Sequence, residues 1–179
     1  QQSVLLRRVA SQISADSIEK ACSMVQNAKQ VLVVSQGASF GHARLFANHL
    51  VMLGKSVFSP PIDSPTLYAR ISRADEGLLV IGLSSTTDCS LVAQTLKVAR
   101  ERGAHTLCLA LSPLAPCARH AEFALTCTLT DPDLPMADSI LIAMIGAFVT
   151  CLQRCMAGTE TNQLAVSEVR REILGDLIP

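Results

Sequence analysis

Three short stretches of the chain are apolar at almost every position, and they constrain the fold more than any other feature. Residues 31–34 read Val-Leu-Val-Val, residues 78–83 read Leu-Leu-Val-Ile-Gly-Leu, and residues 106–111 read Thr-Leu-Cys-Leu-Ala-Leu. Successive side chains of a β-strand point to opposite faces, so a strand without charged positions must be covered on both faces. This pattern is typical of the inner strands of a parallel sheet with helices packed on each side.

The segments between these strands have the spacing and the stop signals of helices. Helices are predicted from Ser14 or Asp16 to residue 28, then over 39–53, 63–73 and 87–102, with Gly54 and Gly103 ending two of them. Two weaker strands are predicted at 56–58 and 121–127. Strands that alternate with helices favour right-handed βαβ units.

The whole chain is therefore predicted to be one α/β domain spanning residues 1–179. Its core, at about residues 15–150, is a three-layer α/β/α sandwich around a five-stranded parallel sheet. Additional helices at 1–13 and within 136–177 flank this core, the latter divided into 136–157 and 161–177.

Composition and charge narrow the class of protein. Hydrophobic residues make up 49% of the chain and charged residues 17%, which indicates a folded core and not a disordered chain. The 15 basic and 15 acidic side chains balance, whereas a domain that binds duplex DNA usually carries a basic excess. Any contact with DNA is therefore expected to be made by a separate domain.

The seven cysteines include no CxxC pair, and several lie within apolar stretches. They are interpreted as reduced, buried thiols, which favours a reducing compartment and a cytoplasmic location. Cys151 and Cys155 are spaced to share a metal on one helix, but no third ligand lies near them in the sequence. We therefore predict neither a metal nor another cofactor.

The apolar stretch 139–152 has the composition of a membrane segment but not the length. It has 14 residues, counting from Ser139 to Leu152, and a bilayer needs roughly 20. The start of the chain also lacks the charged and apolar regions of a signal peptide. The stretch is expected to be a helix buried in the core or against another subunit, and no membrane association is predicted.

Small hydroxylic residues follow two of the predicted inner strands and lead into helices. Backbone N–H groups at a helix N-terminus bind anions, and hydroxyls add donors to phosphate oxygens. Ordinary helix capping remains the alternative explanation for each loop taken alone. The predicted binding residues are Ser35, Gln36, Gly37 and Ser39 after the first strand, and Ser84, Ser85, Thr86 and Thr87 after the strand at 78–83.

These loops resemble segments of the sugar isomerase (SIS) domain family. Residues 35–43, Ser-Gln-Gly-Ala-Ser-Phe-Gly-His-Ala, are similar to its G-x-G-x-S…A segment, and 75–88 to its D-x-x-I-x-I-S-x-S-G-x-T pattern. Residues 99–104 match A-x-x-x-G-A, and Ser-Pro-Leu-Ala at 112–115 with Ala-Glu at 121–122 resembles S-P-L-A…A-D. The flanking helices resemble those of the bacterial RpiR-type transcription regulators.

The resemblance implies a flavodoxin-like sheet and a phosphosugar whose phosphate is held by Ser39, Ser84 and neighbouring hydroxyls. It also implies a ligand-sensing effector domain that forms a homodimer or homotetramer. In such a regulator, DNA would be bound only through an N-terminal helix-turn-helix domain, which these residues do not include.

The chain departs from the family pattern in the second loop. Without gaps, Thr86, Thr87 and Cys89 fall on the second Ser, the Gly and the Thr of the pattern; a one-residue shift uses Ser85, Thr86 and Thr87 instead. Thr is stiffer and bulkier than the Gly, and Asp88 would repel a phosphate. The loop is therefore expected to form an altered or weakened pocket.

Catalysis is a second possibility, because SIS domains also occur in aldose–ketose isomerases, which need a general base. The chain has no acidic residue between Glu19 and Asp63, so the helix after the first loop offers no carboxylate. His42 is the one histidine that follows this loop directly, whereas no pattern places Glu122 or Asp138 near it. We predict a sensing domain and not an enzyme; an isomerase and a degenerate domain that only oligomerises are the alternatives.

Overall fold

A computed structural model describes residues 11–86, 88–128, 134–156 and 159–174. The first ten residues of the helix predicted at 1–13 and part of the helix predicted at 161–177 lie outside these ranges; residues 11–13 form a turn. The second flanking helix is present as α8, Thr159–Leu174.

The five strands form one parallel sheet in the order β2-β1-β3-β4-β5. Their bounds are Gln30–Ser35 for β1, Val57–Phe58 for β2, Leu78–Ser84 for β3, His105–Ala110 for β4 and Phe123–Thr126 for β5. The flavodoxin-like, five-stranded parallel sheet predicted from the sequence is confirmed. The short β2 lies at one edge, and the long apolar strands β1, β3 and β4 occupy the centre.

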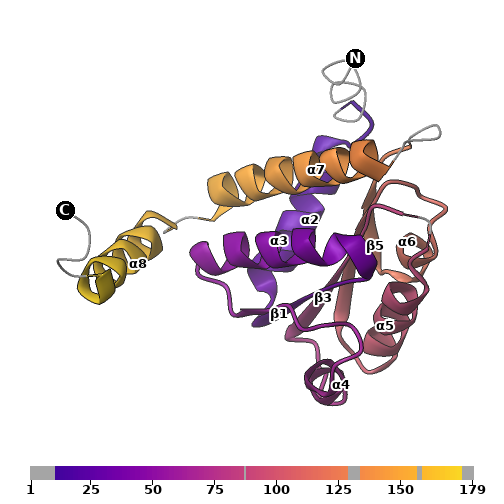
Figure 1. Cartoon of the computed structure of the whole chain (residues 1–179), viewed down its shortest axis with the longest axis horizontal. Helices are drawn as coiled ribbons and strands as arrows, with labels where there is room; N and C mark the ends of the chain where they lie inside the picture. The colour runs from indigo at the N-terminus through magenta and orange to yellow at the C-terminus, as the bar shows by residue number, and fades with distance from the viewer. Residues whose placement is uncertain (1–10, 87, 129–133, 157–158, 175–179) are drawn as a thin grey trace.

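Helices cover both faces of the sheet, which confirms the three-layer sandwich (Figure 1). One face carries α2, Ala15–Asn27, α3, Phe40–Met52, and α7, Leu134–Cys155. The other face carries α4, Pro65–Ile71, α5, Ser90–Glu101, and the short α6, Pro116–His120. In β1, Val31 and Val33 pack on the first layer whereas Leu32 and Val34 pack on the second, which explains why residues 31–34 include no polar side chain.

The long helix α7 belongs to the first of these layers. Its inner side chains Leu141, Ile145, Phe148 and Leu152 are buried, and it packs against α2 and α3. Among the described residues it is the one helix that is long and apolar enough to cross a membrane, over 21 residues from Pro135 to Cys155. The length argument from 14 residues was therefore wrong. Burial in the core, predicted for this helix as an alternative to burial against another subunit, holds for its inner side only, since 44% of its apolar window is buried.

Two boundaries differ from the sequence prediction for local reasons. Helix α5 begins at Ser90 and not at residue 87, because Ser84 and Thr86 hold the preceding loop in a non-helical conformation through side-chain hydrogen bonds to backbone. Helix α6 was not predicted; it begins at Pro116, a residue whose fixed φ suits the first helical turn. At α2 the choice of cap is settled, since Ser14 Oγ accepts the N–H of Ser17 at 3.2 Å.

Candidate ligand-binding site

The sheet order places the two hydroxyl-rich loops next to each other. After β1 the chain crosses to β2 on one side, and after β3 it crosses to β4 on the other. Ser35 at the end of β1 pairs in register with Leu83 near the end of β3. The loops leaving these neighbouring strands therefore diverge, and such a switch point is where open parallel sheets bind ligands.

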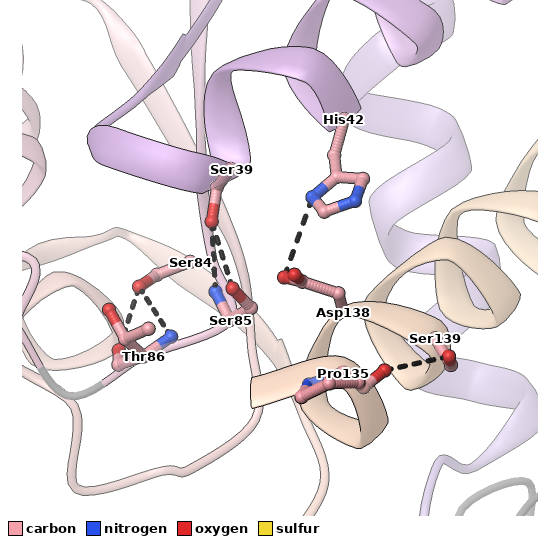
Figure 2. Close-up of polar contacts among 8 residues, drawn as sticks. All are labelled: Ser39, His42, Ser84, Ser85, Thr86, Pro135, Asp138 and Ser139. Carbon is pink, nitrogen blue, oxygen red and sulfur yellow. Dashed lines mark hydrogen bonds and ion pairs between the residues drawn. The ribbon is translucent and has the colours of Figure 1, made fainter. Parts of the chain in front are cut away.

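Direct hydrogen bonds join the two loops (Figure 2). Ser39 Oγ lies 3.0 Å from Ser85 Oγ and accepts the Ser85 backbone N–H at 3.3 Å. Both serines are buried, with 3% and 5% of their surface exposed. The predicted residues Ser39 and Ser85 therefore meet, although 46 positions separate them in the sequence.

The second loop is folded back on itself. Ser84 Oγ donates to the carbonyl of Thr86 at 2.7 Å and accepts the Thr86 N–H at 3.3 Å, and Thr86 Oγ1 donates to the carbonyl of Asp88 at 3.2 Å. Thr87, also predicted for the site, lies outside the described residues. Because these hydroxyls already have backbone partners, an anion would have to exchange with them.

The first loop reaches across to α5. Gln36 Oε1 accepts the backbone N–H of Leu91 at 3.1 Å, so it occupies one of the free donors at this helix start. Gly37 has φ of 60°, a conformation that favours glycine, and it begins the one-turn 3₁₀ helix Gly37–Ser39 ahead of α3. Ser35 Oγ is buried and has no hydrogen-bond partner in the described part of the chain.

A histidine and a carboxylate face each other beside these serines. His42 Nδ1, one turn after Ser39 on α3, lies 3.9 Å from Oδ1 of Asp138, near the start of α7 (Figure 2). Both atoms are buried and lack a hydrogen-bond partner among the described residues. Sequence reasoning singled out His42 but missed its partner, because only the packing of α7 on α3 brings Asp138 to it.

A second pairing of a histidine with a carboxylate, His105 with Glu122, lies at the amino ends of the strands. His105 is the first residue of β4, and its Nδ1 lies 2.8 Å from Glu122 Oε2, just before β5. Both belong to the amino ends of their strands, whereas the two loops follow carboxyl ends. Glu122 is therefore not part of this site.

Buried thiols lie beneath the second loop. Cys89, the residue before α5, accepts the Cys117 N–H at 3.3 Å through its sulfur, and all but two of the seven cysteines are buried. A hydrogen bond with Cys117, together with burial, raises the pKa of the Cys89 thiol. A hydrogen bond with Cys108, together with burial, raises the pKa of Cys117 to about 12. These thiols are therefore neutral packing groups at physiological pH, as the sequence suggested, and not nucleophiles.

The SIS domain family profile matches residues 24–154, which is most of the chain and includes both loops. This chain belongs to the SIS domain family. No curated protein sequence matches the chain significantly.

Solved structures with a similar fold include both regulators and enzymes. It is 25% identical to the sugar isomerase domain of an RpiR transcription factor from Sphaerobacter thermophilus, with a TM-score of 0.81 over 95% of this chain and 94% of that one. The Vibrio vulnificus NanR protein complexed with ManNAc-6P shares 18% identity, with a TM-score of 0.86 over 98% of this chain and 67% of that one. Phosphoheptose isomerase from Neisseria gonorrhoeae shares 18% identity, with a TM-score of 0.66 over 85% and 93% of the two chains.

Proposed function

We propose that this SIS domain is the ligand-sensing effector domain of a cytoplasmic transcription regulator and that it binds a phosphosugar at the two switch-point loops. The contact between Ser39 and Ser85 carries this proposal, because it joins two hydroxyl-bearing loops at the carboxyl ends of β1 and β3. The similarity to the RpiR sugar isomerase domain supports the regulator role, and the NanR complex with ManNAc-6P supports a phosphosugar ligand.

Ligand binding would exchange contacts that the two loops now make with each other. A phosphate oxygen can replace Ser85 Oγ as the partner of Ser39, and a second can take the Leu91 N–H that Gln36 now occupies. Release of Gln36 and Ser39 would shift the start of α3, which packs on α7. The signal would then pass to a separate N-terminal helix-turn-helix domain through the outer helices.

The proposal predicts phosphate-dependent sugar binding that requires Ser39. Isothermal titration with ManNAc-6P, fructose 6-phosphate and the corresponding free sugars should show saturable binding of at least one phosphosugar and no binding of its free sugar. Ser39→Ala should weaken that binding about ten- to a hundredfold, because a hydrogen bond to a charged group contributes roughly 1.5–3 kcal/mol. Ser23→Ala, on the exposed surface of α2, is the matched control and should bind like the wild type.

Two results would contradict the sensing role. One is that no phosphosugar binds at millimolar concentration, which leaves a domain that serves only in assembly. The other is equal affinity in the wild type and Ser39→Ala, provided circular dichroism shows that the variant is folded. Binding to a site elsewhere would then explain the titration.

An isomerase is the second candidate, and the pairing of His42 with Asp138 favours it. The imidazole can take the proton from the carbon next to a sugar carbonyl, and the carboxylate can hold the ring in position and stabilise its cationic form. Fructose 6-phosphate incubated in D₂O would then gain deuterium at C1 in the presence of the wild type and not of His42→Ala. Absence of exchange with a phosphosugar that binds would leave the sensing role alone.

We also propose that the domain forms a homodimer through the outer side of α7 and through α8. Ile142 is 43% exposed on that side of α7, and the hydroxyls of Ser139 and Thr150 there donate to carbonyls of the same helix, which leaves an apolar surface. Helix α8 extends beyond the sandwich and exposes Val169 and Ile173 (Figure 1). Sedimentation velocity at micromolar concentration tests this assembly, and a monomer at all concentrations would rule it out.

A further inference from the structure

A cavity lies at the amino ends of the strands, opposite to the switch-point loops at their carboxyl ends. It has a volume of about 600 Å³ and lies beside α4, where the register partners Gln30 and Leu78 begin β1 and β3. Its wall includes Lys29, Thr66, Arg70, Arg73, Asp75 and Gly77. Small-molecule sites commonly have volumes of about 300–1,000 Å³.

The charge of this cavity is strongly unbalanced for a domain whose net charge is zero. Lys29, Arg70 and Arg73 contribute three positive charges, and Asp75 is the one carboxylate in the wall. One oxygen of that carboxylate, Oδ1, already accepts the Gly77 N–H at 2.8 Å. Among the described residues, no carboxylate lies within ion-pair distance of the three cations. The cavity therefore concentrates positive charge that the described part of the chain leaves unneutralised.

Arg70 has a fixed guanidinium with an unused donor. Its Cζ lies 3.2 Å from the centroid of the Phe58 ring, so the guanidinium is stacked on the aromatic face. Its Nε is buried and has no hydrogen-bond partner among the described residues. A buried guanidinium N–H almost always has an acceptor, and an unpaired one needs an explanation. The same guanidinium lines the cavity, where an anionic ligand would accept hydrogen bonds from its terminal N–H groups.

Lys29 is held in the wall by its neighbour Gly77. The Lys29 backbone N–H donates to the Gly77 carbonyl at 2.9 Å. A Cβ at position 77 would lie 2.9 Å from Lys29 Cδ and 3.1 Å from Asp75 Oδ1. Because Gly77 has no side chain, the side chain of Lys29 can pack directly against it. This packing places a second cation in the wall that Arg70 and Arg73 also line.

We propose that this cavity is a binding site for the phosphate group of a small phosphorylated molecule, separate from the switch-point site and independent of its proposed role. Three cations against one carboxylate leave two net positive charges, which match a phosphate dianion. Guanidinium groups bind phosphate oxygens through paired N–H bonds, and the hydroxyl of Thr66 adds a neutral donor to the wall. A carboxylate monoanion would leave part of this charge unpaired.

The test is a titration of the chain with inorganic phosphate at low ionic strength, followed by ¹⁵N-resolved NMR. Saturable shifts are expected at the amides of Gln30, Gly77 and Leu78. Arg73→Gln and Lys29→Gln should each weaken phosphate binding about tenfold or more, since each removes a charge without disturbing the stack of Arg70 on Phe58. Arg44→Gln, exposed near the start of α3 at the carboxyl ends of the strands, is the matched control and should leave the shifts at these amides unchanged.

The outcomes separate this site from the one at the switch point. Shifts at Gln30 and Gly77 that persist in Ser39→Ala and disappear in Arg73→Gln would support the proposal. Shifts confined to Ser85 and Leu91 would overturn it, whether or not phosphosugars bind there. Unchanged binding in both charge variants would also overturn it. So would a glutamate-rich peptide that binds more tightly than phosphate and depends equally on Arg73, because the cavity would then face an acidic protein.

Discussion

Replacing Phe148 by Ala is expected to lower the free energy of unfolding by about 3–5 kcal/mol, the usual cost of removing a large aromatic side chain from a core. Phe148 is 2% exposed, and its ring centroid lies 5.9 Å from that of Phe46 in a tilted pair. The pair connects α7 to α3 within the larger of the two cores. A cavity at this point would remove contacts from both helices and would loosen the elements that carry Asp138 and His42.

Urea denaturation followed by circular dichroism measures this loss, with Leu45→Ala on the neighbouring helix α3 as the matched control. Leu45 is 42% exposed, so its truncation should change the free energy of unfolding by no more than about 0.5 kcal/mol. A loss below about 1 kcal/mol for Phe148→Ala would show that α7 is not packed into the core as described.

Replacing Gly82 by Val is expected to lower the free energy of unfolding by about 3 kcal/mol, through crowding and not through a cavity. Gly82 lies in the central strand β3, and a Cβ there would be 2.7 Å from Val92 Cγ1 and 2.9 Å from Leu96 Cδ1. Val92 is β-branched and has little freedom to rotate away. Helix α5 would have to move off the sheet, and the loop between Ser84 and Cys89 would move with it.

Thermal and urea unfolding measure the cost of this substitution, and Gly146→Ala provides the opposite expectation. A Cβ at Gly146, on the exposed side of α7, meets nothing within 4 Å. Ala is a better helix former than Gly, so this variant should be more stable by about 0.5–1 kcal/mol. Equal stabilities for Gly82→Val and the wild type would mean that α5 is not in close contact with β3.

The candidate site was predicted from the sequence in outline only. Ser39 and Ser85 were identified because hydroxyl side chains that follow a buried strand and precede a helix can bind an anion, and this order of residues is visible in the local sequence. The hydrogen-bond partner of Gln36 was not predicted. Its side-chain oxygen Oε1 accepts the backbone N–H of Leu91, which is 55 positions away in the sequence. Asp138 was also missed, because a carboxylate on a distant helix has no local signal that relates it to His42.

The cationic cavity had no sequence signal at all. Lys29 precedes one strand, Arg70 and Arg73 lie in and after a short helix, and each resembles an ordinary surface cation in the sequence. They line one cavity only because β1 and β3 are neighbours in the sheet and α4 packs at their amino ends. Their proximity results from the order of the strands in the sheet, which the positions of charged residues along the sequence do not reveal.

The sequence by itself determined the parallel α/β class, because the apolar stretches of β1, β3 and β4 require cover on both faces, and that cover must come from the intervening helices. It also determined which loops follow the carboxyl ends of those strands. The tertiary structure decided which loops and helices become neighbours: the order β2-β1-β3-β4-β5 joined Ser39 to Ser85, and the packing of α7 on α3 brought Asp138 to His42. Burial is dictated by local side-chain chemistry and can be read along the chain, whereas contacts between distant residues depend on how the layers pack.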